Sequence, residues 1–172
     1  MQELQYLLGY PDHLTNQVQE MIANNTLADL LLKKYPSVHG ICTDKALYDY
    51  VITIKNAFMH KTQHLSKVLF DSKIQMKNQA LGVHKFVSRV QGKKLKAKNE
   101  IRIPSTFRKG PEPFLRMIVV HELAHLKEKD HNKAFFKLCI HMEPAYQQLE
   151  FDMRFYLTQR DLFRSGKPRG GL

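Results

Sequence analysis

The stretch that most constrains this chain is the sequence His-Glu-Leu-Ala-His, which begins at residue 121. On an α-helix His121 and His125 lie one turn apart on the same face, so their two imidazoles can bind one zinc ion. Glu122 is rotated by about 100° from His121, which suits a general base that acts on a metal-bound water. The apolar spacing just before the motif is helical. The motif therefore predicts a buried helix that carries a zinc-dependent hydrolase site.

A catalytic zinc usually has three protein ligands and one water, so a third ligand is needed. The candidates that follow the motif are His131, His141, Glu143 and Glu150. His131 is favoured because residues 126–130 form a short segment, and a turn there can bring the imidazole back to the ion. The reaction also needs a group that stabilises negative charge on oxygen. Four residues stay open for that role, namely Arg89, Tyr146, Arg154 and Tyr156.

The residues before the motif predict an α+β fold with a helical N-terminal part, residues 1–60. Thr26 and Asp29 have the spacing of a capping box, and Thr43 is a suitable N-cap for a helix over residues 44–58. No residue of this part is assigned to chemistry.

Residues 65–104 predict a small, mostly antiparallel sheet of three or four strands. Apolar and polar residues alternate on both sides of Asp71-Ser72, which indicates a hairpin. A second alternating segment covers residues 83–90, and another strand covers residues 100–103.

Residues 111–163 predict the metal-site helix followed by further helices. Pro111 and Pro113 suit the first turn of that helix. We expect it to break near Asp130, whose side chain could cap a helix that begins at Asn132. We expect a single domain over residues 1–163 and a flexible basic tail over residues 164–172.

Composition narrows the setting of the chain. No apolar run has the length of a membrane span, the N-terminus lacks a signal-peptide pattern, and there are only two cysteines. These features predict a cytoplasmic protein without a membrane partner, and they leave the oligomeric state open. The net charge of +11 indicates an anionic partner such as a nucleotide, a nucleic acid or a membrane surface. A basic surface with a charged tail explains the same charge equally well.

The segment His-Glu-Leu-Ala-His-Leu-Lys-Glu-Lys-Asp-His-Asn-Lys-Ala-Phe-Phe, residues 121–136, resembles the signature of the YgjP-like family of small bacterial zincins. That family lies near the SprT-like and WLM metallopeptidases. Residues 81–104 also resemble the strand-turn-strand segment that precedes the metal helix in the family. The resemblance implies a zincin-like fold with a single zinc ion. It also implies that His121, His125 and His131 are the ligands and that Glu122 is the general base.

Two departures limit the resemblance. Metzincins share this histidine spacing but carry glycine where this chain has Glu128, so the chain does not resemble a true metzincin. Many members of the YgjP-like family carry Arg-Trp-Gly-Ser-Cys where residues 89–93 read Arg-Val-Gln-Gly-Lys. The substrate side of the site can therefore differ from that of its relatives.

Three functions follow from these observations. The first is a zinc-dependent hydrolase of the metallopeptidase type, acting on a peptide. The second is a metal-dependent nucleoside triphosphate pyrophosphatase, converting for example UTP to UMP and diphosphate, since an activated water can also attack phosphorus. Basic side chains that could hold the phosphates are Lys93, Lys94, Lys96, Lys98, Arg102, Arg108 and Lys109. The third is a nucleic-acid-associated SprT-like domain, which is less favoured because no basic stripe is interleaved with aromatic residues.

Overall fold

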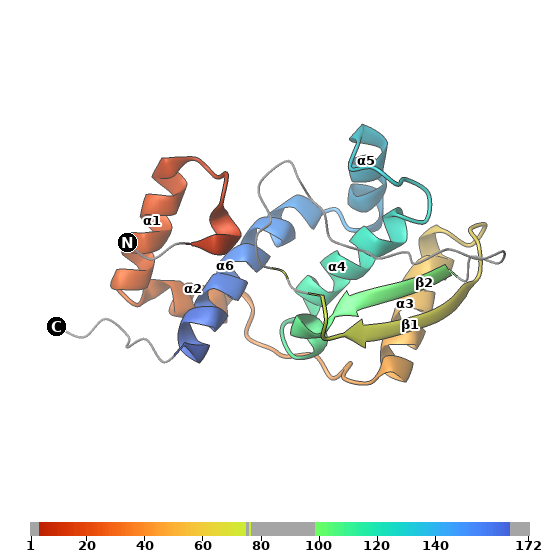
Figure 1. Cartoon of the computed structure of the whole chain (residues 1–172), viewed down its shortest axis with the longest axis horizontal. Coiled ribbons are helices and arrows are strands. Elements are labelled where there is room, and N and C mark those ends of the chain that lie inside the picture. Colours follow the sequence, from red (N-terminus) through yellow and green to blue (C-terminus); the bar gives the residue numbers. More distant parts are fainter. Residues whose placement is uncertain (1–3, 75, 77–98, 166–172) are drawn as a thin grey trace. The chain divides into compact units, whose positions relative to one another are not determined.

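The computed structural model describes residues 4–74, 76 and 99–165 (Figure 1). The described residues form six α-helices, two short 3-10 helices and two strands. They group into two compact units. The first unit contains residues 4–36, 76 and 150–165, and the second contains residues 37–74 and 99–149. Each unit is described separately below, and the single domain over residues 1–163 stays a prediction.

The first unit is helical, as predicted for the N-terminal part. It contains η1 (Gln5–Leu7), α1 (Asp12–Ala23), α2 (Thr26–Lys34) and the portion of α6 (Tyr146–Arg164) from residue 150 onward. Its apolar core forms because helical spacing turns aliphatic side chains to one side of α1 and α2. The buried members of that core are Leu4, Leu7, Val18, Leu27 and Leu31.

The start of α2 differs from the prediction. Asn25 precedes the helix in the left-handed conformation, with φ of 56°, and no side chain caps the helix. The Thr26 hydroxyl instead donates to the carbonyl of Met21, at 3.3 Å. The predicted capping box is therefore wrong, because the left-handed residue makes the turn and Thr26 already lies inside the helix.

Charged side chains of α6 are buried in the first unit, and each has protein partners. Asp152 accepts hydrogen bonds from Lys34 and from the hydroxyl of Tyr35. Arg154 binds Glu150, with 2.8 Å from Nε to Oε1, and donates to the carbonyl of Tyr6 at 3.0 Å. Buried charges persist only when they are paired and hydrogen-bonded in this way.

The second unit contains α3 (Asp44–Phe58), β1 (Leu65–Asp71), β2 (Asn99–Pro104), η2 (Ser105–Arg108), α4 (Glu112–Ala124) and α5 (Lys133–Met142). Thr43 caps α3, since its side chain accepts a hydrogen bond from the backbone N–H of Ala46 at 3.2 Å. The prediction for this helix and its cap is confirmed. Helix α3 packs against β1, and α4 packs against β2 (Figure 1).

The sheet of the second unit is parallel, so the predicted antiparallel arrangement is wrong. Figure 1 shows β1 and β2 pointing the same way. Val68 lies opposite Ile101, and Phe70 lies opposite Ile103. The alternation in β1 sets which side chains are buried but not which strand is the partner. At the end of β1, Asp71 does not turn the chain into a hairpin. Its carboxylate accepts from the backbone N–H of Lys73 at 2.8 Å and from Arg102 at 3.0 Å.

Parallel strands need a long connection. Most of the connection here, including the predicted strand over residues 83–90, lies outside the described residues.

Helix α4 is the central helix of the second unit. Pro111 precedes its first turn, and all residues from Met117 to Ala124 are buried. A helix that is apolar on all sides must lie inside a core. Among the described residues, no helix has both the length and the apolar content needed to cross a membrane.

The turn between α4 and α5 also departs from the prediction in one detail. Helix α5 begins at Lys133, and the side chain of Asn132 caps it by accepting from the backbone N–H of Phe135 at 2.8 Å. Asp130 was expected to supply this cap, and it does not. Asparagine serves well here because its short side chain reaches the exposed amides of the first turn.

Candidate metal centre

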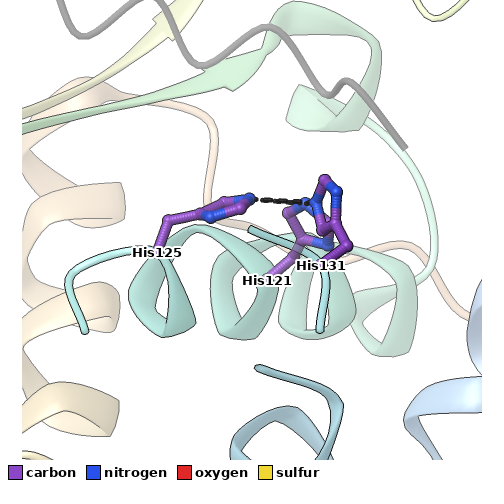
Figure 2. A group of neighbouring side chains, drawn as sticks. All are labelled: His121, His125 and His131. Carbon is purple, nitrogen blue, oxygen red and sulfur yellow. Dashed lines mark hydrogen bonds between the residues drawn. The ribbon is translucent and has the colours of Figure 1, made fainter. Parts of the chain in front are cut away.

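Three histidines converge in the second unit. His121 lies in the last turn of α4, His125 follows the end of α4, and His131 comes from the segment before α5 (Figure 2). The distances between their Nε2 atoms are 3.2 Å for His121 and His125, 3.1 Å for His125 and His131, and 3.2 Å for His131 and His121. The three nitrogens therefore form a nearly equilateral triangle.

The triangle fits a bound cation better than a set of hydrogen bonds. A neutral imidazole carries only one ring N–H, so three Nε2 atoms cannot all bond to one another and also keep their outer bonds. A tetrahedral zinc ion, with bonds of about 2.0–2.1 Å to nitrogen, holds its ligand atoms about 3.3–3.4 Å apart. The observed distances are close to this value. The donor set is also chemically suitable, because imidazole is a common ligand of zinc and related divalent metals.

The second ring nitrogen, Nδ1, orients the rings of His121 and His125 through a hydrogen bond. His125 Nδ1 donates to the carbonyl of Glu128 at 2.9 Å, and a carbonyl can only accept, so the proton sits on Nδ1. The lone pair of His125 Nε2 then points into the triangle. Burial also lowers the pKa of His125, against the opposing effect of the Glu128 carbonyl, and so favours the neutral form that a metal requires. His121 Nδ1 lies 2.7 Å from the hydroxyl of Tyr146.

Phe135 forms an apolar support for the triangle. Its ring centroid lies 4.9 Å from that of His121, 4.6 Å from that of His125 and 4.7 Å from that of His131. Phe135 is fully buried, so it restricts the movement of all three rings. No function was predicted for Phe135 from the sequence. Its position one helical turn after Asn132, next to a predicted ligand, was the available signal.

The structure also locates the other ligand candidates. Among the described residues, the only group of three or more histidine, cysteine or acidic side chains with metal-binding spacing is His121, His125 and His131. The ring of His141 packs edge-on against Phe58, with centroids 5.5 Å apart. Glu143 pairs with Arg116 at 2.6 Å. Glu150 belongs to the first unit, where it pairs with Arg154.

Glu122 follows His121 on α4, and only 4% of its surface is exposed. The helix fixes its direction relative to His121 on the same element. Its role as the general base stays a prediction.

Four residues were candidates for stabilising negative charge on the reacting oxygen. The hydroxyl of Tyr146 bonds to the outer nitrogen of His121 and not to the side where the three Nε2 atoms meet. Arg154 and Tyr156 belong to the first unit, and Arg89 lies outside the described residues. Tyr146 is therefore the one candidate of the four in the described part of the second unit, and its hydroxyl contacts the Nδ1 side of His121.

The predicted phosphate-binding residues are engaged in other contacts, exposed on the surface, or outside the described residues. Arg102 is held by Asp71 and Glu100, at 3.0 and 3.1 Å. Arg108 lies over the ring of Phe70, 5.0 Å from its centroid, and Lys109 is exposed. The lysines at positions 93, 94, 96 and 98 lie outside the described residues.

Comparison with known proteins identifies the family of the chain. The model of the YgjP-like family, described as a metallopeptidase domain, matches residues 55–154. UTP pyrophosphatase of Escherichia coli (strain K12) is 57% identical over 162 residues, which cover 94% of this chain and 97% of that protein. No solved structure matches the chain significantly. The matched region contains all three histidines and Glu122. The chain therefore belongs to the YgjP-like family of metal-dependent hydrolases.

Proposed function

We propose that this protein hydrolyses nucleoside triphosphates, UTP among them, to the monophosphate and diphosphate. His121, His125 and His131 hold a zinc ion, and Glu122 is the general base. The observation that carries the proposal is the 57% identity, along 94% of the chain, with a protein named UTP pyrophosphatase. That similarity extends along nearly the whole chain and is not confined to the metal-binding motif.

The chemistry can be assigned to residues of the second unit. A zinc ion at the triangle would polarise a phosphoryl oxygen and lower the pKa of a water to about 7. Glu122 accepts a proton from the attacking water. The water oxygen forms a bond to the α-phosphorus, the bond from that phosphorus to the bridging oxygen breaks, and diphosphate leaves with the electron pair.

The charge of the protein supports an anionic substrate. The whole chain carries a net charge of +11. In the second unit, Lys127 and Lys129 are exposed, and both lie in the segment that joins His125 to His131. These lysines place positive charge on the loop between two metal ligands, where it attracts a triphosphate.

A metallopeptidase is the second candidate. The family model that matches residues 55–154 is described as a metallopeptidase domain. The same three histidines and the same glutamate can serve peptide hydrolysis, because a zinc site can polarise a carbonyl as well as a phosphoryl oxygen. The two functions therefore differ in the substrate and not in the predicted ligands.

The test compares the two substrate classes with one pair of proteins. Zinc-loaded wild type and Glu122→Gln are offered a panel of nucleoside triphosphates and, separately, an unfolded protein. We expect the wild type to release UMP and diphosphate from UTP. We expect Glu122→Gln to keep its zinc and to lose about 10²–10⁴-fold in turnover.

Cleavage of the unfolded protein, with no release of UMP and with loss of cleavage in Glu122→Gln, would contradict the pyrophosphatase and favour the peptidase. Full activity of Glu122→Gln on either substrate would contradict the assigned base.

A further inference from the structure

Behind the metal triangle lies a chain of three buried polar side chains. His121, Tyr146 and Cys139 are 1%, 2% and 0% exposed. The hydroxyl of Tyr146 lies 2.7 Å from His121 Nδ1 and also hydrogen-bonds the Cys139 side chain. At this depth water does not compete for the bonds, and the hydrogens that join His121, Tyr146 and Cys139 can run in either of two directions.

The two arrangements have opposite effects on the metal site. If the Cys139 thiol donates to Tyr146, the hydroxyl donates to Nδ1 of His121, and the ring proton is then on Nε2. That proton would point into the triangle and block a metal. If His121 Nδ1 donates to the hydroxyl, the hydroxyl donates to the sulfur, and the lone pair of Nε2 faces the metal.

We propose that Tyr146 is a positioning residue for the metal site, which accepts the Nδ1 hydrogen of His121 and donates its own hydrogen to the sulfur of Cys139. The pair fixes His121 in the tautomer that binds a metal. This gives the buried tyrosine and cysteine a function beyond packing. The proposal rests on the proposed metal site and does not depend on which substrate is hydrolysed.

The backbone around Tyr146 keeps the hydroxyl in place. The N–H of Tyr146 donates to the carbonyl of Glu143 at 2.9 Å, and the N–H of Ala145 donates to the Glu143 carboxylate at 3.1 Å. That carboxylate pairs with Arg116 at 2.6 Å, and Arg116 also donates to the carbonyl of Met142 at 3.0 Å. Arg116 and His121 both belong to α4. The helix that carries the ligand therefore also holds the turn that orients it.

The sulfur is suited to be the end of this chain. Burial raises the pKa of Cys139 to about 12, so it stays a neutral thiol near pH 7. A neutral thiol is a weak acceptor and does not compete with the histidines for a metal as a thiolate would. The same residue is therefore a partner of Tyr146 and not a fourth ligand.

The first measurement is zinc affinity, by competition with a chromophoric chelator, for wild type, Tyr146→Phe and Cys139→Ala. Tyr48→Phe is the matched control, because it removes a tyrosine hydroxyl of the same unit that donates to the carbonyl of Leu65. We expect Tyr146→Phe to bind zinc about 10–100-fold more weakly than the wild type. We expect the zinc affinity of Cys139→Ala to fall between those of the wild type and Tyr146→Phe, and we expect Tyr48→Phe to match the wild type.

The second measurement separates positioning from a general loss of structure. Nitrogen chemical shifts of the histidines, recorded on the metal-free ¹⁵N-labelled proteins, report the tautomer of His121. We expect the proton on Nδ1 in the wild type and a shift toward Nε2 in Tyr146→Phe, with thermal unfolding recorded to verify folding. If Tyr146→Phe does not fold, the tautomer and zinc affinity of Cys139→Ala decide.

Unchanged zinc affinity in Tyr146→Phe would overturn the proposal. A weaker affinity with an unchanged His121 tautomer would also overturn it, because the tyrosine would then act only through packing. A wild type that binds no zinc would overturn the metal site itself.

Discussion

The two units of this protein both bury polar side chains, but they use them differently. In the first unit each buried charge ends on a protein partner, as Arg154 does with Glu150 and Asp152 does with Lys34. In the second unit, three imidazole nitrogens point at one another across 3.1–3.2 Å. Pairs of opposite charges stabilise the fold of the first unit. The three converging imidazole nitrogens of the second unit could instead hold a metal ion. Burial alone does not distinguish the two, and the kind of partner does.

The largest expected effect comes from breaking the triangle. We expect His131→Ala to lose most of its bound zinc after dialysis and to lose hydrolytic activity, because two imidazoles alone bind zinc weakly. Metal analysis after dialysis measures this. His141→Ala is the matched control, since the ring of His141 contacts Phe58 and lies outside the group of three. Equal zinc content in the two variants would contradict the assignment of His131.

The next effect comes from breaking the scaffold of the first unit. Arg154→Ala leaves Glu150 without its buried partner, and we expect the free energy of unfolding to fall by about 3–5 kcal/mol. Urea unfolding followed by circular dichroism measures the change. Zinc affinity of the variant that remains folded should stay near that of the wild type. A stable Arg154→Ala variant with lost zinc would reverse the roles we give to the two units.

A smaller effect is expected where the site meets its apolar support. Phe135→Leu keeps the core apolar but removes the ring that contacts all three imidazoles. We expect the free energy of unfolding to fall by about 1–2 kcal/mol and zinc affinity to weaken by less than in Tyr146→Phe. Parallel urea and chelator titrations test both. An unchanged zinc affinity would mean that the ring contacts do not order the ligands.

The smallest effect concerns one hydrogen bond of the scaffold. Tyr35→Phe removes the hydroxyl that donates to Asp152, while Lys34 still pairs with that carboxylate. We expect a loss of about 1 kcal/mol in the free energy of unfolding and no change in zinc binding. A loss as large as that of Arg154→Ala would show that Asp152 depends on Tyr35 and not on Lys34.

Some local features of the sequence predicted local structure well, but the caps predicted at Thr26 and Asp130 were wrong. Helix α3 and its Thr43 cap depend on neighbouring residues, and both were predicted at the observed positions. The grouping of the three histidines was also predicted from residues that are close in the sequence. His121 and His125 share a helical face, and His131 is only six residues further on. In both cases the residues that interact lie within about ten positions of one another, so their spacing can be recognised in the sequence.

Features that depend on distant residues were predicted poorly. The alternation of β1 gives no information about its partner, so the parallel pairing with β2 was missed. Tyr146 is 25 residues from His121, and only the fold shows that its hydroxyl contacts Nδ1. Its sequence position suggested a part in stabilising negative charge, while the structure places it on the outer side of the ligand. The contacts that Phe135 makes with the three histidines were likewise not predicted from the sequence, and only the fold shows them.

The three-histidine zinc site is tested most directly by X-ray absorption at the zinc edge, recorded on the zinc-loaded full-length protein. The three-histidine site predicts three imidazole nitrogens and one further light atom around the zinc, with zinc–nitrogen distances of about 2.0–2.1 Å. In dialysed His131→Ala, most of this protein-bound zinc signal should be lost. A sulfur neighbour at about 2.3 Å, or only two imidazoles in the wild type, would contradict the three-histidine site.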